Sequence, residues 1–288
     1  MSEENQFFTG STTAVLGLVT SLAATLCLHL PCLAQTEADA DFYFKRAMKE
    51  KVNLETQDRA VQDFATAIKL APKRDDILAE QADLLFVIEE DEEALVAAES
   101  ATKLNTKNAL AWSILGKCLS RMKRPQEGLD ALNHAISLTP ENRKDQLFDE
   151  RARLLTILGR YSEAEKDLDV AVAKQPHAST NLADRIEVCI RQKKWPKVIA
   201  DCDAFMRMDK SHNASIYHKR ALAHSGLGQY ALAIKDFKSA LKESPDDYQI
   251  HRDLKAAYLA ANDKAAAAKE SEIMKALLSD FRWVRRKN

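Results

Sequence analysis

The amino-acid sequence predicts an all-α protein built from about seven stacked helix–turn–helix repeats. Composition points to helices first: the 288 residues include only 7 glycines and 7 prolines, and aromatic residues make up 7%. A β-sandwich or β-barrel needs many turn residues and many aromatic or β-branched strand residues. This composition argues against an all-β fold, and the abundant Ala, Leu, Lys and Glu favour helices.

Proline residues then mark a period of about 34 residues along the chain. Pro72 and Pro140 are 68 residues apart, and Pro176 and Pro245 are 69 residues apart, both close to twice that period. Each follows a helix-forming stretch, and a proline ends a helix because its ring clashes with the preceding turn. Self-similarity at a fixed period is typical of repeat architectures. The repeats are expected at residues 41–74, 75–108, 109–142, 145–178, 179–212, 214–247 and 248–281.

Small and large residues recur inside each repeat in a way that suits two antiparallel helices. Small residues at the eighth, twentieth and twenty-seventh positions let the helices approach closely, and large residues at the fourth, eleventh and twenty-fourth positions fill the space between them. The fourth repeat follows this pattern with Ala152, Ala164, Ala171, Phe148, Leu155 and Leu168. Because one helical hairpin cannot bury its apolar face alone, neighbouring hairpins must stack. Gly159 and Gly228 are expected to end first helices in a left-handed conformation.

This pattern resembles the tetratricopeptide repeat family. The third repeat carries Trp112, Leu115, Gly116, Leu119, Gly128, Leu132, Ala135 and Pro140, and the sixth carries Tyr217, Ala221, Gly228, Tyr230, Ala233, Phe237, Ala240 and Pro245. In the second repeat Thr106 stands where the closing proline is expected. The fifth and seventh repeats depart from the pattern, with Lys210 in place of the proline in the fifth and Lys255 at a close-packing position in the seventh. The resemblance implies a right-handed superhelical solenoid, whose concave groove is lined by the first helix of each repeat and receives peptide segments.

The groove-facing positions usual in the family give seven candidate binding residues. They are Lys45, Lys49, Phe86, Lys117, Arg121, Arg153 and Arg191. Most are cationic and would make part of the groove basic, which favours capture of an acidic or C-terminal carboxylate peptide. The alternative is an ordinary charged helix surface. Chaperone-binding members of the family use a Lys/Asn/Arg clamp that Lys49 and Glu80 interrupt here, so chaperone binding is not predicted.

No motif for catalysis, cofactor binding or metal binding accompanies the repeats. The sequence contains no Gly-rich phosphate loop, no H-E-x-x-H, no C-x-x-C and no G-x-S-x-G. A net charge of −1 at pH 7 gives no overall attraction for nucleic acid. We therefore predict a non-catalytic protein–protein interaction scaffold without cofactor, metal or nucleic-acid partner, its oligomeric state left open. The alternative is an accessory or adaptor subunit of an enzymatic or transport complex, with the chemistry in a partner.

Residues 1–34 differ from the repeats and are expected to be a signal peptide or an N-terminal membrane anchor. Residues 13–30 are apolar apart from small hydroxyl residues and one histidine, and Pro31 stops any helix there. Small residues at Cys32 and Ala34 suit cleavage after Ala34, although no basic residue precedes the apolar segment. The same 18 residues are long enough to span a bilayer. The prediction is an exported protein, periplasmic or secreted, and the alternative is a membrane-anchored one.

Two short segments and one cysteine pair complete the expected organisation. Residues 35–40 are expected as a short linker, and residues 282–288 as a basic C-terminal tail. Cys189 and Cys202 fall at the eleventh and twenty-fourth positions of the fifth repeat, which should face each other across one hairpin. In an exported chain this placement suits a disulfide. The alternative is two small buried thiols that never pair.

Overall fold

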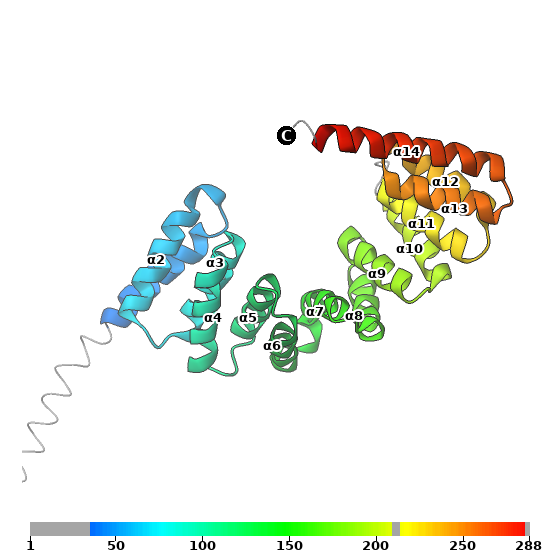
Figure 1. Cartoon of the computed structure of the whole chain (residues 1–288). Helices are drawn as coiled ribbons and strands as arrows, with labels where there is room; N and C mark the ends of the chain where they lie inside the picture. Colours follow the sequence, from blue (N-terminus) through cyan, green and yellow to red (C-terminus); the bar gives the residue numbers. More distant parts are fainter. Residues whose placement is uncertain (1–34, 209–213, 286–288) are drawn as a thin grey trace, which may run out of the picture. The chain divides into compact units, whose positions relative to one another are not determined.

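The computed structural model describes residues 35–208 and 214–285 of the chain, without the side chains of Asp145 and of residues 280–285. Within these ranges the regular structure is helical and contains no strand, so the predicted all-α fold is confirmed (Figure 1). Residues 1–34, on which the predicted signal peptide or anchor falls, lie outside the described part.

Successive helices form pairs joined by short turns (Figure 1). Residues 35–50 are helical and precede a short 3₁₀ helix, η1. The elements are η1 (Leu54–Thr56), α2 (Gln57–Leu70), α3 (Asp75–Val87), α4 (Asp91–Leu104), α5 (Ala109–Arg121), α6 (Pro125–Leu138), η2 (Glu141–Arg143), α7 (Asp145–Ile157), α8 (Tyr161–Lys174), α9 (Ser179–Arg191), α10 (Trp195–Met208), α11 (Ala214–Gly226), α12 (Tyr230–Glu243), α13 (Tyr248–Ala260) and α14 (Lys264–Arg285). From α3 onward, the first helix of each pair begins at the residue where the sequence places the start of a repeat.

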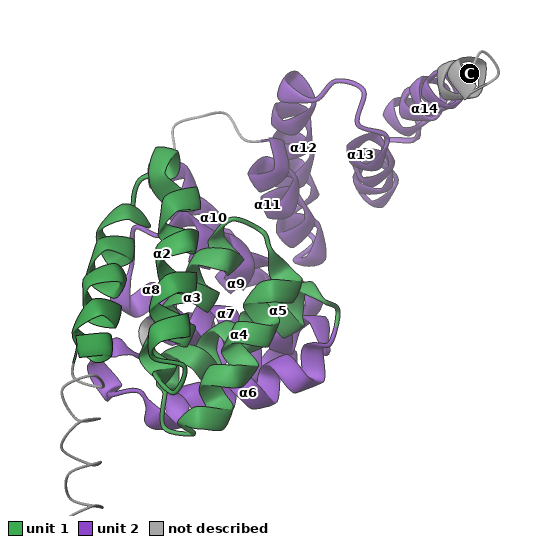
Figure 2. Cartoon of the chain, turned by 90° about the vertical axis from the view of Figure 1, so that its left-hand side faces the viewer, with its two compact units in different colours: residues 1–123 green, residues 124–288 purple. Residues whose placement is uncertain are grey.

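The chain divides into two compact units, residues 1–123 and 124–288 (Figure 2). Unit 1 includes the helical residues 35–50 and α2 to α5, and unit 2 includes α6 to α14. The division falls between α5 and α6, inside the stretch 109–142 that the sequence assigns to one repeat.

Both segments expected outside the repeats are partly helical. Residues 35–40 belong to the first helix, where Ala40 is fully buried, because the Ala- and Glu-containing stretch favours a helix and its end packs into the core. Helix α14 continues to Arg285 and is 22 residues long, whereas the other second helices have 14. No Gly or Pro interrupts the sequence from Glu270 to Arg285, so nothing in it stops the helix.

The close helix pairing rests on small buried side chains. In the sixth pair Ala221, Ala233 and Ala240 are fully buried and pack around Phe237, which is fully buried as well. Gly159 and Gly228 have φ angles of 73° and 74°, so the predicted left-handed ends of these first helices are confirmed. At the same point of four other pairs the left-handed residue is not glycine but Glu89, Lys123, Lys193 or Asn262. The turn geometry is therefore set by the repeat, not by glycine.

In several helix pairs a buried arginine–aspartate contact joins the two helices. The seventh residue of the first helix is an arginine, and both oxygens of the aspartate at the seventh residue of the second helix accept from it. The pairs are Arg151–Asp167 at 2.7 and 2.7 Å, Arg185–Asp201 at 2.9 and 2.7 Å, and Arg220–Asp236 at 2.7 and 2.8 Å. The three aspartates are only 4–6% exposed. Bidentate geometry and burial make each contact specific and strong.

The same arginines also reach the preceding pair. The Nη1 atom of each donates to the ninth residue of the preceding second helix: Arg151 to Asn133 at 3.0 Å, Arg185 to Asp169 at 2.9 Å and Arg220 to Asp203 at 2.6 Å. One guanidinium therefore joins three helices, and we call this three-residue contact the Arg–Asp clamp. It fixes how one helix pair stacks on the next within unit 2.

Removing the carboxylate of a clamp should destabilise the chain more than removing an exposed one. Asp236→Ala leaves the half-buried Arg220 without its bidentate partner, and we expect a loss of about 2 kcal/mol in the free energy of unfolding. Glu272→Ala, which removes an exposed partner of Lys275 on α14, should cost less than about 0.5 kcal/mol. Urea unfolding followed by circular dichroism measures both, and equal losses in the two variants would contradict the role of the clamp.

Candidate peptide-binding surface

Three of the seven predicted residues come together on the first helices of unit 1. Phe86 lies near the end of α3, and Lys117 and Arg121 lie on α5. The Arg121 guanidinium carbon is 3.6 Å from the centre of the Phe86 ring, and the Lys117 Nζ atom is 5.9 Å from it. Both cations therefore lie within cation–π range of one aromatic ring.

The two cations of this cluster differ in their partners. Arg121 donates to the Phe86 carbonyl oxygen at 2.9 Å and to Asp91 Oδ1 at 2.7 Å, so a carboxylate already balances its charge. Lys117 is half-buried and makes no ion pair within the part of the chain that the structure describes. A partly desolvated ammonium without a carboxylate attracts an anion more strongly than a fully solvated one. Lys117 is thus the cation of this cluster whose charge no described carboxylate balances.

The first pair has a different register from the one that the sequence prediction assumed. Arg46 donates to Asp63 and precedes the fully buried Ala47, just as Arg151 precedes the fully buried Ala152. The Arg–Asp separation is 17 residues here and 16 in the later pairs, so the first helix is shifted by one residue. The extra residue is accommodated in the long turn that contains η1. A shift of one residue turns a helical position by about 100°.

This register takes Lys45 and Lys49 off the groove-facing positions, and both are exposed. A residue that the prediction missed, Lys51, instead reaches α3, where its Nζ atom contacts Glu80 and lies 3.2 Å from Asp83 Oδ2. Burial opposes the charge of Lys51, but these two carboxylates outweigh it and raise its pKa. The predicted and the observed register of the first helix differ by the one extra residue in this turn. No residue type in the sequence indicates that the turn is longer here.

The two predicted cations of unit 2 are already paired with acidic neighbours. Arg153 on α7 donates through Nε to Asp184 Oδ2 on α9 at 3.0 Å and lies 3.4 Å from Glu150 Oε2. Arg191 donates to Glu187, one turn earlier on α9, at 3.1 Å. These contacts leave Arg153 and Arg191 less available for a peptide carboxylate than Lys117.

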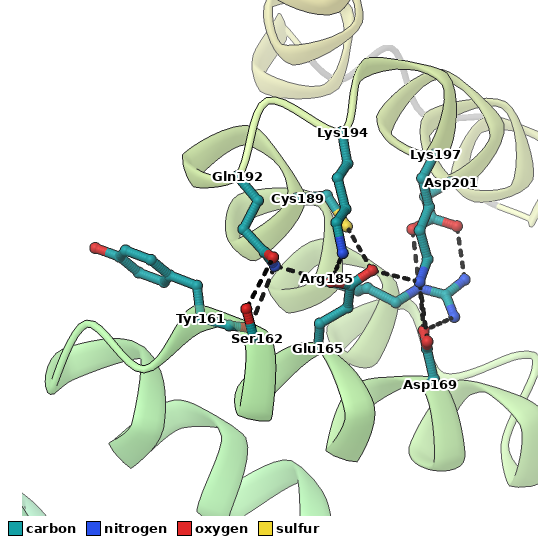
Figure 3. Close-up of polar contacts among 10 residues, drawn as sticks. All are labelled: Tyr161, Ser162, Glu165, Asp169, Arg185, Cys189, Gln192, Lys194, Lys197 and Asp201. Carbon is teal, nitrogen blue, oxygen red and sulfur yellow. Dashed lines mark hydrogen bonds and ion pairs between the residues drawn. The ribbon is translucent and has the colours of Figure 1, made fainter.

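A dense ionic cluster that the sequence did not indicate joins α8 to α9 and α10 (Figure 3). Glu165, 7% exposed, accepts from Gln192 Nε2 at 2.9 Å, from Lys197 Nζ at 2.9 Å and from Lys194. Asp169 accepts from Lys197 at 2.7 Å and from Arg185 at 2.9 Å. Its residues lie on three helices and in the turn between α9 and α10, which is why spacing within one helix does not reveal it.

The cluster around Glu165 holds the fourth pair against the fifth, and its carboxylates and cations balance one another. The three carboxylates of Glu165, Asp169 and Asp201 face three cations in the same contacts (Figure 3). Burial by itself would raise the pKa of Glu165, but the hydrogen bonds from Lys194, Lys197 and Gln192 outweigh it and lower the pKa to about 2. Glu165 is therefore ionised throughout the physiological range.

The described cysteines are buried thiols. Cys118, Cys189 and Cys202 are all free in the structure, so the predicted pairing of Cys189 with Cys202 is not formed in it. Burial raises the pKa of Cys118 and Cys189 to about 11 and that of Cys202 to about 12. A thiol with so little thiolate at neutral pH is a poor nucleophile.

Residues 35–208 and 214–285 contain neither a metal-binding cluster nor a helix that could span a membrane. No group of three or more His, Cys, Asp or Glu side chains in these ranges is arranged to hold a metal ion. No helix within the same ranges is both long and apolar enough to cross a bilayer. The apolar segment 13–30, the predicted tether, lies outside them.

Sequence comparison identifies the kind of repeat. Residues 214–247, the α11–α12 pair, match the family model described as tetratricopeptide repeat. The chain is similar to human Tetratricopeptide repeat protein 13, with 29% identity over 143 residues that cover 49% of this chain and 16% of the relative. It is also similar to the Arabidopsis thaliana peptidyl-prolyl cis-trans isomerase FKBP42, with 25% identity over 201 residues, 68% of this chain and 49% of the relative. The chain thus spans about half or less of these curated relatives.

Structural comparison shows the same fold. The crystal structure of YrrB, a tetratricopeptide repeat protein with an unusual peptide-binding site, matches with a TM-score of 0.62 and 19% identity, over 67% of this chain and 97% of YrrB. The predicted resemblance is therefore confirmed: the chain contains a tetratricopeptide repeat, and its stacked helix pairs have the fold of that family. This fold supports a role in protein–protein interaction.

The depressed pKa of Glu165 makes part of the stability depend on pH. Its pKa is about 2 in the folded chain and ordinarily 4.5, so its stabilising contribution is complete above about pH 4.5 and disappears as the pH falls toward 2. We expect Glu165→Gln to lower the free energy of unfolding by roughly 2 kcal/mol at pH 7, and the difference from wild type to shrink between pH 4.5 and pH 3.

Urea unfolding at a series of pH values measures this difference. The exposed Glu272→Gln on α14 is the matched control, since it removes the same charge outside the buried cluster. A difference between wild type and Glu165→Gln that stays constant from pH 7 to pH 3 would show that the ionised carboxylate is not what stabilises the cluster.

Proposed function

We propose that the chain is a non-catalytic protein–protein interaction scaffold that binds an acidic peptide, or a peptide carboxyl terminus, at the first-helix surface of α3 and α5. The observation that carries this proposal is the half-buried Lys117 ammonium, placed over the Phe86 ring without a carboxylate partner in the described residues. The ring offers apolar contact to a peptide side chain, and Lys117 offers charge to a carboxylate.

The neighbouring contacts support the same surface. Arg121 is held over Phe86 by Asp91, so the aromatic ring and its flanking cations are fixed before a ligand arrives. Preorganised side chains lose less conformational entropy on binding. The similar protein YrrB is described as having a peptide-binding site, which supports peptide recognition by this fold.

A charge-reversal pair tests the surface. From a display library of peptides with a free carboxyl terminus and acidic last residues, binders to the full chain are selected and measured by fluorescence anisotropy. We expect Lys117→Glu to weaken their affinity at least tenfold, about 1.4 kcal/mol, because a repelling carboxylate replaces the ammonium. Lys107→Glu makes the same charge change at an exposed lysine of unit 1 and should leave affinity unchanged.

Equal affinities for the Lys117→Glu and Lys107→Glu variants would count against the surface. Peptides amidated at the carboxyl terminus show which carboxylate the surface recognises. Loss of binding on amidation indicates the terminal carboxylate, and retained binding indicates acidic side chains. If no peptide of the library binds the full chain, recognition of acidic peptides is wrong.

We further propose that the scaffold is exported or held at a membrane through residues 13–30. The apolar character of this segment and the small residues before Gln35 support the proposal. A second candidate, an adaptor subunit of an enzymatic or transport complex, has the same fold and differs only in the nature of the partner.

N-terminal sequencing of the protein from its native host, together with fractionation, distinguishes an exported scaffold from a membrane-anchored one. A chain that begins at Gln35 in the exported soluble fraction is the expected result. An intact segment 1–34 in the membrane fraction would indicate a tethered scaffold, and an intact segment in the cytoplasmic soluble fraction would contradict both.

A further inference from the structure

An open apolar cleft lies in unit 1, away from the Lys117 cluster. It has a volume of about 620 Å³ and lies between the second helices α2 and α4, with side chains of α3 also lining it. Most of its lining is aliphatic, and Val96 on α4 remains 64% exposed. This volume falls within the range typical of ligand-binding pockets, about 300–1,000 Å³.

The cleft opens where the second pair lacks the Arg–Asp clamp. In α3, Gln81 is the seventh residue, the position of the clamp arginine in α7, α9 and α11. In α4, Ala97 is the seventh residue, where α8, α10 and α12 have the clamp aspartate. In α2, Ala65 is the ninth residue, where the preceding helices of the complete clamps supply Asn133, Asp169 or Asp203. All three substitutes, Gln81, Ala97 and Ala65, line the cleft.

The third pair also lacks the clamp arginine, but the residue that replaces it is large. In the third pair Leu115 takes the position of the arginine, and this leucine is only 8% exposed, so a large apolar side chain replaces the guanidinium. In the second pair the replacements are two alanines and one glutamine. Glutamine is shorter than arginine and the two alanines are small, so side-chain volume that the complete clamps supply is missing at the cleft.

The charges at the two ends of the cleft are unlike. Glu92 and Glu93, at the start of α4, are exposed and make no ion pair among the described residues. Lys69, near the end of α2, lines the cleft as well. Because α2 and α4 both run antiparallel to α3, the start of α4 and the end of α2 lie at opposite ends of the cleft. The cleft therefore has an acidic end and a basic end, with an apolar middle.

We propose that this cleft is a docking site for an amphipathic helix of a partner protein, whose apolar side chains occupy the space left by the missing clamp and whose lysine or arginine residues meet Glu92 and Glu93. A groove bounded by helices accepts another helix by packing its side-chain ridges between theirs. The complementary charges fix the direction in which that helix lies. This site is separate from the peptide surface at Lys117 and does not depend on it.

The clamps of unit 2 supply the design of the test. The triple variant Ala65→Asp, Gln81→Arg and Ala97→Asp installs in the second pair the side chains that fill this space in the later pairs. A second variant, Glu92→Lys with Glu93→Lys, reverses only exposed charges and leaves the apolar walls intact. Circular dichroism establishes that each variant keeps the helical content of the wild type.

The probe is a display library of 14-residue helical peptides, selected on the full chain and measured by fluorescence anisotropy. We expect the selected peptides to carry leucine, isoleucine or phenylalanine at i, i+3 or i+4 and i+7, with lysine or arginine at one end. Their affinity should fall at least tenfold for the filled triple variant and for the Glu92/Glu93 reversal. It should be unchanged for Lys117→Glu, which tests the other surface.

Three results would overturn the proposal. One is a library that yields no helical peptide able to distinguish the wild type from the variants. Another is a set of apolar, basic-ended binders whose affinity for each variant equals their affinity for the wild type. The third is a set of binders that are acidic or that lack an apolar stripe. If the triple variant loses its helical content, the charge-reversal variant alone decides the outcome.

Discussion

The stacking of helix pairs in unit 2 depends on arginines that reach buried aspartates. An aspartate that is only 4–6% exposed is stable in a helical core only if its charge is balanced and both oxygens are hydrogen-bonded. The clamp meets both conditions with one guanidinium, whose planar fork matches a carboxylate and keeps a further N–H for the preceding helix pair. Because alanines bring the helices of a pair close together, the arginine needs to span only a short distance. Each clamp therefore specifies both the pairing within a repeat and the stacking between repeats.

Helix pairs that share the repeat pattern differ in structure where the clamp residues are replaced or where further ion pairs extend the clamp. Where Leu115 replaces the arginine, the apolar packing continues. Where Ala65, Gln81 and Ala97 occupy the three positions, a cleft opens on the second-helix side of unit 1. Around Glu165 the clamp of Arg185 is extended by Lys194 and Lys197 into a larger ionic cluster. A repeat array can thus gain local surfaces through the loss or addition of a few polar side chains, without any change of fold.

The charge of a helix surface is a poor guide to its capacity for binding a ligand until the ion-pair partners of its residues within the chain are known. Arg153, Arg191 and Lys117 look equivalent in the sequence, since all three occupy groove-facing positions. In the structure, two of them contact carboxylates, whereas Lys117 lies beside an aromatic ring and contacts none of the described carboxylates. The distinction comes from residues about 30 positions away, such as Asp184 relative to Arg153, or from a neighbour one turn away, such as Glu187 relative to Arg191.

Local propensities and small residues repeated at fixed spacing are enough to predict the helical class, the period and the starts of the first helices from Asp75 onward. The left-handed turns at Gly159 and Gly228 are predictable too, since glycine adopts that conformation without steric cost, but the repeat imposes the same turn at Glu89, Lys123, Lys193 and Asn262, which no residue type indicates. The register of the first helix depends instead on tertiary packing, because one extra residue in a turn moves Lys45 and Lys49 to another face. The clamps, the Glu165 cluster and the cleft also depend on tertiary packing, because each joins side chains from three helices, and the distances between helices are set by packing and not by the spacing of residues along the chain.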